Sequence, residues 1–273
     1  MPPAGSNHSA IPCVPPRNAG EDYFGRGYYK LYRNYLIPRE QSEAEARFLL
    51  AELAPARGER WLDLPCGYGR HLLELRRLAP SLRVTGGERN PHYLRERGLR
   101  RVAALACCDM RRLPWADGAF DAVLNLLNSF GYDPARPRGG QGRRTPPGDR
   151  TALEEWARVL RPGGRLALDL PDRLGLLRLV RRQPCIRYCM DGHEATERFA
   201  WDAAGQCLLN RTRWSWPGGG EEAGYRLRLY TPRQIEQLLG RAGFRILRSY
   251  GDFQGNPYQP GRSDRLLLIC RRD

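Results

Sequence analysis

The stretch WLDLPCGYGRH, residues 61–71, decides the fold of this chain. Its apolar start has the pattern of a buried strand that ends at the carboxylate Asp63, and a turn containing Gly67 and Gly69 follows before a helical pattern begins. A Gly-x-Gly turn at the carboxyl end of a strand lets the backbone approach a nucleotide where side chains would clash. A second apolar run ends at Glu88, whose carboxylate can accept hydrogen bonds from both hydroxyls of a ribose. The first half of the chain therefore predicts a nucleoside-binding α/β unit.

The glycine pattern does not fit a dinucleotide. The dinucleotide fingerprint requires a third glycine, but that position falls on Leu72, and an alignment one step earlier would need glycine at Pro65. Asp63 would also repel a pyrophosphate, whereas it would favour a ligand with a positively charged amino-acid end. S-adenosylmethionine (SAM), a ribonucleoside with a sulfonium and an ammonium group, meets both conditions.

Two further strand ends agree with this ligand. The apolar run 102–107 is followed by Asp109, which can accept from the adenine amino group, and by Met110, which can lie on the ring face. The run 120–126 contains Asn125, which can present its backbone or side chain to the ammonium group of the ligand. Parallel strands place their carboxyl ends at one edge of a sheet, so these residues are expected to lie together.

The chain resembles the class I SAM-dependent methyltransferases of the methyltransferase-domain-25 type from about Asp22 to Arg272. The motifs that carry the resemblance are Asp-x-x-x-Gly-x-Gly-Arg-His from Asp63, Cys-Asp-Met-Arg from Cys108, Leu-Asn-Ser-Phe-Gly-Tyr from Leu127, Val-Leu-Arg-Pro-Gly-Gly from Val159, and the tail motifs Arg228–Pro232, Ala242–Phe244 and Tyr250–Phe253. The resemblance implies an α/β, Rossmann-like fold with a mostly parallel seven-stranded sheet, flanking helices and a small inserted antiparallel β-sheet. One departure is Glu88, where the family usually has Asp.

The predicted site follows from these motifs. The expected cofactor-binding residues are Asp63, Pro65, Cys66, Gly67, Gly69, Glu88, Arg89, Asp109, Met110 and Asn125. Aromatic rings can stabilise a cationic donor, and Tyr28, Tyr32, Phe130 and Tyr132 are expected nearest the methyl group. His71 either contacts the methionine end of the cofactor or caps the helix that follows the turn, and His193 is expected in a loop. The spacing of polar residues identifies no general base.

The pattern of the whole chain gives the expected order of elements. Strands are expected at 60–65, 82–87, 102–107, 120–126, 164–170, 244–250 and 264–271, and helices at 70–79, 91–97, 151–160 and 232–242. Period-two alternation over 194–201, 207–216 and 223–230 predicts an inserted three-stranded sheet. One of its faces carries Phe199, Trp201, Leu208, Trp214, Trp216, Leu227 and Leu229, which are expected to pack on the parallel sheet.

The expected organisation has five parts. Residues 1–20 read as a flexible tail, 21–58 as an N-terminal helical cap, 59–174 as the SAM-binding core, 175–230 as the inserted sheet covering the acceptor site, and 231–273 as the completion of the core. Within the core, 134–150 is rich in Arg, Gly and Pro and reads as a disordered loop, either a lineage-specific insertion or a contact for an acidic substrate.

The composition indicates which partners and which cellular location to expect. The net charge is +15 and Lys30 is the only lysine, so arginine carries almost all of the positive charge. Because the arginines are scattered and do not alternate with aromatic residues, a nucleic-acid partner is possible but not favoured. No apolar run approaches the ~20 residues that a membrane span needs, and no signal peptide is evident, so the expected location is the cytoplasm.

The eight cysteines make no Cys-x-x-Cys pair and have no histidine at zinc spacing, so no metal site is expected. Cys107, Cys108 and Cys270 lie in apolar strand contexts, where burial is expected. Cys185 and Cys189 could pair in a loop, although reduced thiols are favoured.

Three functions remain open from the sequence. The favoured one is a SAM-dependent methyltransferase that transfers a methyl group to nitrogen or oxygen of a small molecule by in-line displacement. The alternatives are an RNA or protein methyltransferase, suggested by the positive charge, and a SAM-binding scaffold without turnover. The sequence does not predict the oligomeric state.

Overall fold

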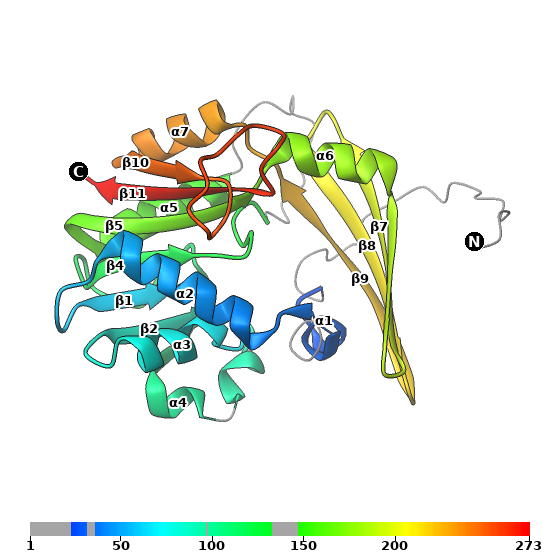
Figure 1. Cartoon of the computed structure of the whole chain (residues 1–273), viewed down its shortest axis with the longest axis horizontal. Coiled ribbons are helices and arrows are strands. Elements are labelled where there is room, and N and C mark those ends of the chain that lie inside the picture. The colour runs from blue at the N-terminus through cyan, green and yellow to red at the C-terminus, as the bar shows by residue number, and fades with distance from the viewer. Residues whose placement is uncertain (1–22, 32–35, 97, 133–146) are drawn as a thin grey trace, which may run out of the picture.

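The computed structural model of the chain describes residues 23–31, 36–96, 98–132 and 147–273. Its main sheet has seven strands in the order β10-β11-β5-β4-β1-β2-β3 (Figure 1). Their bounds are β1 Arg60–Asp63, β2 Arg83–Glu88, β3 Ala104–Cys107, β4 Phe120–Asn125, β5 Leu160–Pro171, β10 Phe244–Tyr250 and β11 Arg265–Arg272. Strands β1 to β5 pair in parallel, and β11 runs antiparallel to both of its neighbours. The predicted fold class is confirmed.

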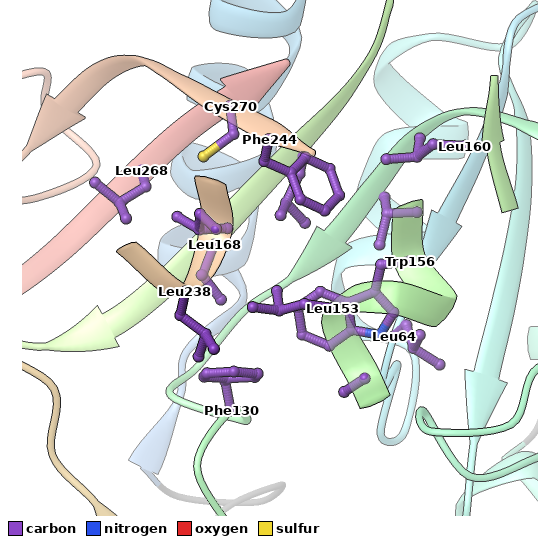
Figure 2. Packing of buried hydrophobic residues seen from close by; sticks show 14 of the residues in the cluster. Leu64, Phe130, Leu153, Trp156, Leu160, Leu168, Leu238, Phe244, Leu268 and Cys270 are labelled. Atoms are coloured by element: carbon purple, nitrogen blue, oxygen red, sulfur yellow. The ribbon is translucent and has the colours of Figure 1, made fainter. Parts of the chain in front are cut away.

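Helices cover both faces of this sheet. The helices of the described residues are α1 Arg26–Leu31, α2 Arg39–Leu53, α3 Arg70–Leu78, α4 Leu99–Val102, α5 Pro147–Val159, α6 Arg173–Arg182 and α7 Pro232–Arg241, of which α1 and α6 pack on the second sheet instead. One face packs on α5 and α7, where Trp156 and Leu238 meet alternate residues of the central strands such as Leu168 (Figure 2). The other face packs on α2, α3 and α4. Successive residues of β5 alternate between the two clusters, as burial on both faces of a sheet requires.

A second sheet of four antiparallel strands projects from the main body (Figure 1). Its strands are β6 Cys185–Met190, β7 His193–Asp202, β8 Cys207–Trp216 and β9 Gly219–Arg228. The sequence predicted three of them and missed β6 and the preceding helix α6. In β6 exposed and half-buried positions alternate, but its polar and apolar residues do not follow a clear period-two pattern. The predicted apolar face is present, but it packs on α6 and the segment around Tyr23 and Leu31 rather than on the parallel sheet.

Several other local predictions were wrong. The segment expected as a helix over 91–97 forms only the 3₁₀ turn η2, Tyr93–Arg95, followed by the short helix α4. Helix α5 begins at Pro147, so the last residues of the expected 134–150 loop are helical; residues 134–146, like the tail 1–20, lie outside the described residues. His193 begins strand β7 instead of lying in a loop. Cys185 and Cys189 lie in β6, not in a loop, and are free thiols as the sequence favoured. Cys107 is exposed, because β3 is the edge strand of the sheet.

Candidate active site

The site begins at the turn between β1 and α3. Gly67 and Gly69 have φ angles of +54° and +82°, a region that residues with a Cβ rarely adopt. The amide of Gly69 donates to the carbonyl of Cys66 at 2.9 Å, which closes the turn, and Gly69 then caps the start of α3. The free amides at the start of this helix point toward the carboxyl edge of the sheet, where an anionic or polar ligand group can bind.

Gly69 should not tolerate a side chain. A Cβ at this position would lie 2.2 Å from Cδ1 of Leu99, and the residue would also hold a left-handed φ. We expect Gly69→Ala to lower the free energy of unfolding by about 2 kcal/mol, from strain and repacking of α4. Gly240→Ala is the matched control, because Gly240 is an exposed helical residue with no neighbour within 4 Å of an added Cβ, and it should be neutral or slightly stabilising. Equal melting temperatures for the two variants would contradict this prediction.

Glu88 holds the turn from the end of β2. Its Oε2 accepts from the amide of Gly67 at 2.9 Å, and its Oε1 accepts from the amide of Asn90 at 2.7 Å. Burial raises the pKa of the carboxyl, and the backbone amides of Asn90 and Gly67 partly offset that rise. Each carboxylate oxygen has a second acceptor position, so Glu88 can accept from two ligand hydroxyls while it fixes the turn.

Asp63 lies directly beneath the same turn. It is 2 % exposed, and neither carboxylate oxygen has a hydrogen-bond partner among the residues that the structure describes. Burial raises its pKa to about 7, against an opposing effect of the Arg70 guanidinium. A buried carboxylate without partners is costly unless a cation or donor arrives. This observation fits a ligand that brings positive charge to the turn.

Helix α3 contributes a buried ionic cluster beside Asp63. Glu45 of α2 accepts from Arg70 at 2.6 Å and from Nε2 of His71 at 2.7 Å. Burial lowers the pKa of His71 to about 4, so the imidazole is neutral at physiological pH. Hydrogen bonding from His71 and the charge of Arg70 lower the pKa of Glu45 to about 2, against the effect of its burial. His71 therefore does not cap the helix: it links α3 to α2, and its ring lines the cavity described next.

A cavity of about 840 Å³ opens at this edge of the sheet. One part of its lining follows the strands β1, β2 and β3: Leu64–Tyr68, Arg70, His71, Glu88–Tyr93 and Cys108–Arg111. The rest of the described lining is a second group of residues: Phe24, Gly25, Tyr28, Leu126, Leu127, Ser129, Gly131, Tyr132, Gly148, Asp149, Ala152 and Glu221–Ala223. The second group comes from the N-terminal segment, the loop after β4, helix α5 and strand β9. The inserted sheet and the N-terminal segment thus complete a cavity that the parallel sheet begins.

Most of the predicted site residues line this cavity. They are Tyr28, Pro65, Cys66, Gly67, His71, Glu88, Arg89, Asp109, Met110 and Tyr132. Tyr28 and Tyr132 each contact Phe24 edge-on, and burial raises the pKa of both hydroxyls. Asp109 is held by Arg111 through two hydrogen bonds of 2.9 and 2.6 Å, which keeps the pKa of its carboxyl low.

Four predicted positions do not line the cavity, and one lies outside the described residues. Asp63 and Gly69 lie behind the turn, where they shape it. Asn125 is fully buried, and its Nδ2 donates to the carbonyl of Leu64 at 2.7 Å, so its side chain joins β4 to the turn instead of facing a ligand. Phe130 is likewise packed in the core against Trp156. Tyr32 is outside the described residues.

Sequence reasoning missed Asp149 and Glu221, which line the cavity, and Glu45, which holds Arg70 and His71. Glu45, Asp149 and Glu221 stand in segments without a recognisable motif, so nothing marked them. Glu45 had one weak signal, since it shares a helix face with the apolar Leu49 and Leu53, and a carboxylate on such a face needs a partner. Glu221 follows a glycine run that predicts only a turn.

Comparison with known proteins identifies the core. Residues 62–164, which contain the turn, Glu88, Asp109 and strand β4, match the family described as methyltransferase domain. Residues 62–164 carry a methyltransferase domain. A relative from Desulfotalea psychrophila, a ubiquinone/menaquinone biosynthesis C-methyltransferase, is 32 % identical over 143 residues, which are 51 % of this chain and 52 % of that protein. The chain spans about half or less of the length of the curated relatives it matches.

Solved structures share the fold over nearly the whole chain. A SAM-dependent methyltransferase from Clostridium acetobutylicum superposes with a TM-score of 0.70 at 16 % identity, covering 90 % of this chain and 96 % of that one. The sugar N-methyltransferase KedS8 from Streptoalloteichus covers 100 % of this chain and 99 % of its own, with a TM-score of 0.62 at 19 % identity. The cofactor of this methyltransferase domain is SAM, and the partnerless Asp63 beside a turn closed by Glu88 fits its cationic amino-acid end and its ribose.

The part of the chain that the structure describes contains no cluster of three or more His, Cys, Asp or Glu residues suited to a metal ion. None of the described helices combines the length and the apolar character that a membrane crossing needs.

Proposed function

We propose that this protein is an enzyme that transfers the methyl group of SAM to a nitrogen or oxygen atom of a small-molecule acceptor. The observation that carries the proposal is the cavity, which joins the cofactor edge of the parallel sheet to a wall of aromatic rings from another part of the chain. A site bounded on both sides suits a small molecule better than a polymer. KedS8 shares the fold over 99 % of its own chain and is a sugar N-methyltransferase, and this likeness also favours a small acceptor.

The roles of the residues follow from their positions. Glu88 accepts from the ribose hydroxyls, Asp63 stabilises the ammonium end through the turn, and Asp109 and Met110 hold the adenine. The cofactor supplies an electrophilic methyl group, whose bond to sulfur breaks as the bond to the acceptor forms, leaving a neutral thioether. Tyr28 and Tyr132 exclude water from this region and stabilise positive charge with their ring faces. We also propose the sheet β6–β9 as the cover of the acceptor site.

The proposal is tested with methyl-labelled SAM and a cell extract separated into small-molecule, RNA and protein fractions. We expect label in the small-molecule fraction and its loss with Glu88→Ala. Label in RNA or protein would replace the proposal with one of the alternatives. SAM binding by calorimetry without label in any fraction would favour a scaffold.

A further inference from the structure

The loop that follows β4 has a backbone conformation that leucine rarely adopts. Leu127 and Asn128 have φ angles of +55° and +54°, and no other two successive non-glycine residues among those that the structure describes both lie in this left-handed region. Asn tolerates the region, whereas a bulkier side chain such as that of Leu127 adopts it at a cost in free energy. Contacts with the surrounding structure must therefore hold Leu127 in place.

Asp169, near the carboxyl end of β5, makes the contact that holds this loop. Its Oδ2 accepts from the Leu127 amide at 2.9 Å and from Nη1 of Arg265 at 2.7 Å. The residue is fully buried. Burial raises the pKa of the carboxyl to about 6, against the opposing effects of Arg265 and the Leu127 amide, so it is mostly ionised at neutral pH. A hydrogen bond to a buried, ionised acceptor is strong enough to offset the cost of the Leu127 conformation.

Arg265 fixes Asp169 from the neighbouring strand. Asp169 lies opposite Leu267 of β11, so Arg265, two residues earlier in β11, is on the same face of the sheet. Cζ of Arg265 also lies over the Phe253 ring, 5.0 Å from its centre, which orients the guanidinium. A chain of contacts thus runs from Phe253 through Arg265 and Asp169 to the backbone of the loop.

The loop held in this way lines the cavity beside the glycine turn. Leu126, Leu127 and Ser129 are lining residues, and the Ser129 hydroxyl donates to the Leu126 carbonyl at 2.6 Å. The strand before the loop is joined to the segment that begins the turn, because the amide of Leu64 donates to the Leu124 carbonyl at 2.8 Å. A change in the loop backbone would therefore alter the cavity next to the turn.

We propose that Asp169 is a positioning residue of this methyltransferase, which holds the loop 126–129 in the left-handed conformation that the cofactor cavity requires. The inference rests on the proposed function, because it takes the cavity as the site of SAM. Asp169 does not itself line the cavity, so it acts through the backbone of Leu127 and not through contact with a ligand. Without its carboxylate the loop would populate other conformations, and cofactor affinity would fall with the fraction of molecules in the binding conformation.

Calorimetry on the full chain with S-adenosylhomocysteine, the demethylated cofactor, tests the proposal. Asp169→Ala removes the acceptor of the Leu127 amide, so it should raise the dissociation constant about tenfold or more. Asp169→Asn keeps an oxygen of the same geometry for that amide and should stay within about threefold of the natural protein. Equal dissociation constants for the two variants would overturn the proposal.

Asp172 provides the control for a purely structural role. It is also a buried carboxylate, directly after β5, but it accepts from the Tyr258 hydroxyl at 2.6 Å and from the amides of Gly175 and Gly261 at 2.6 and 2.9 Å, none of which belongs to the loop after β4. Asp172→Ala should lower the melting temperature and leave the dissociation constant within about threefold. If Asp169→Ala behaved in the same way, Asp169 would be a structural residue and the proposal would fail.

A glycine at position 127 tests whether the conformation of Leu127 is the link. Glycine adopts a left-handed φ without the steric cost, so the loop of Leu127→Gly depends less on Asp169. In that background Asp169→Ala should raise the dissociation constant about threefold at most, against tenfold or more with leucine. The same factor in both backgrounds would show that Asp169 does not act through Leu127.

Hydrogen exchange needs neither a ligand nor a folded variant. In the natural protein the Leu127 amide should exchange at least about tenfold more slowly than the Asn128 amide, for which the described residues provide no acceptor. Mass spectrometry with fragmentation to single amides measures both rates, and equal rates would overturn the proposal. If the natural protein did not bind S-adenosylhomocysteine, the proposed function would fail, and the exchange rates would still decide whether Asp169 holds the loop.

Discussion

We expect Glu88→Ala to abolish detectable cofactor binding at micromolar protein concentration. The substitution removes the proposed acceptor of both ribose hydroxyls and also leaves the amides of Gly67 and Asn90 without their carboxylate. Charge-assisted hydrogen bonds contribute about 1.5–3 kcal/mol each, so the loss of two ligand bonds should raise the dissociation constant of SAM at least about a hundredfold. Isothermal titration calorimetry with SAM measures the change directly.

A shorter carboxylate separates the ligand effect from the effect on the turn. Glu88→Asp keeps the charge, and Asp is usual at this position in similar methyltransferases, so its dissociation constant should rise by about tenfold at most. Thermal unfolding shows whether Glu88→Ala still folds. A folded Glu88→Ala protein that binds SAM as tightly as Glu88→Asp would show that the carboxylate does not hold the ribose.

The sequence predicted the cofactor edge because its signals are local. The apolar runs, the turn with Gly67 and Gly69, and the carboxylates that end β1 and β2 all depend on neighbours within a few residues. Buried parallel strands also read as continuous apolar runs, which makes the central strands easy to recognise. The strands β1, β2 and β4 were accordingly placed within a few residues of their observed bounds.

The acceptor side could not be predicted, because its residues come together only through tertiary structure. Gly25, Asp149 and Glu221 are far apart in the sequence and line one cavity. Helix α6 escaped recognition because two of its leucines, Leu174 and Leu179, are exposed, so its apolar residues do not mark a single buried face. A single sequence carries little information about contacts of this kind.

Asn125 and His71 show how a correct motif can mislead about a role. Both stand at the expected strand or helix end, yet Asn125 binds the Leu64 carbonyl and His71 binds Glu45. Each side chain forms a hydrogen bond with a residue of the protein that does not belong to the motif. A residue type at a motif position therefore predicts placement near the ligand better than it predicts contact with it.

The free energy of unfolding should depend on pH through the ionisation of Asp63, the buried carboxylate beneath the turn. Burial raises the pKa of Asp63 to about 7 in the folded protein, from the ordinary aspartate value of 3.8. A carboxyl whose folded pKa is raised has no effect on stability below the unfolded pKa and destabilises increasingly as pH rises to the folded pKa. Because one pKa unit corresponds to about 1.4 kcal/mol, the penalty should reach about 4 kcal/mol above pH 7.

Asp63→Asn has no ionisable group at this position. The difference in unfolding free energy between the variant and the natural protein therefore gives the contribution of Asp63 alone. In the absence of cofactor, the variant should gain stability relative to the natural protein from pH 4 to pH 7, and the gain should level off near 4 kcal/mol. His71, whose folded pKa is lowered to about 4, has the opposite dependence between pH 4 and 6.5. It is present in both proteins, so its contribution cancels in the difference. Urea unfolding at intervals of half a pH unit provides the curve.

Saturating SAM should stabilise the natural protein more than Asp63→Asn. The difference in unfolding free energy between the two proteins should therefore shrink or reverse. The ammonium group of the cofactor stabilises the ionised form of Asp63, so the folded pKa falls and the penalty at pH 8 becomes a gain. Cofactor binding at pH 6 should therefore release a proton in the natural protein and not in Asp63→Asn, which calorimetry in buffers of different ionisation enthalpy detects. A difference curve that is flat from pH 4 to 8 would show that Asp63 is ionised throughout and has a partner in solution, and the argument that it awaits the cationic end of the cofactor would fail.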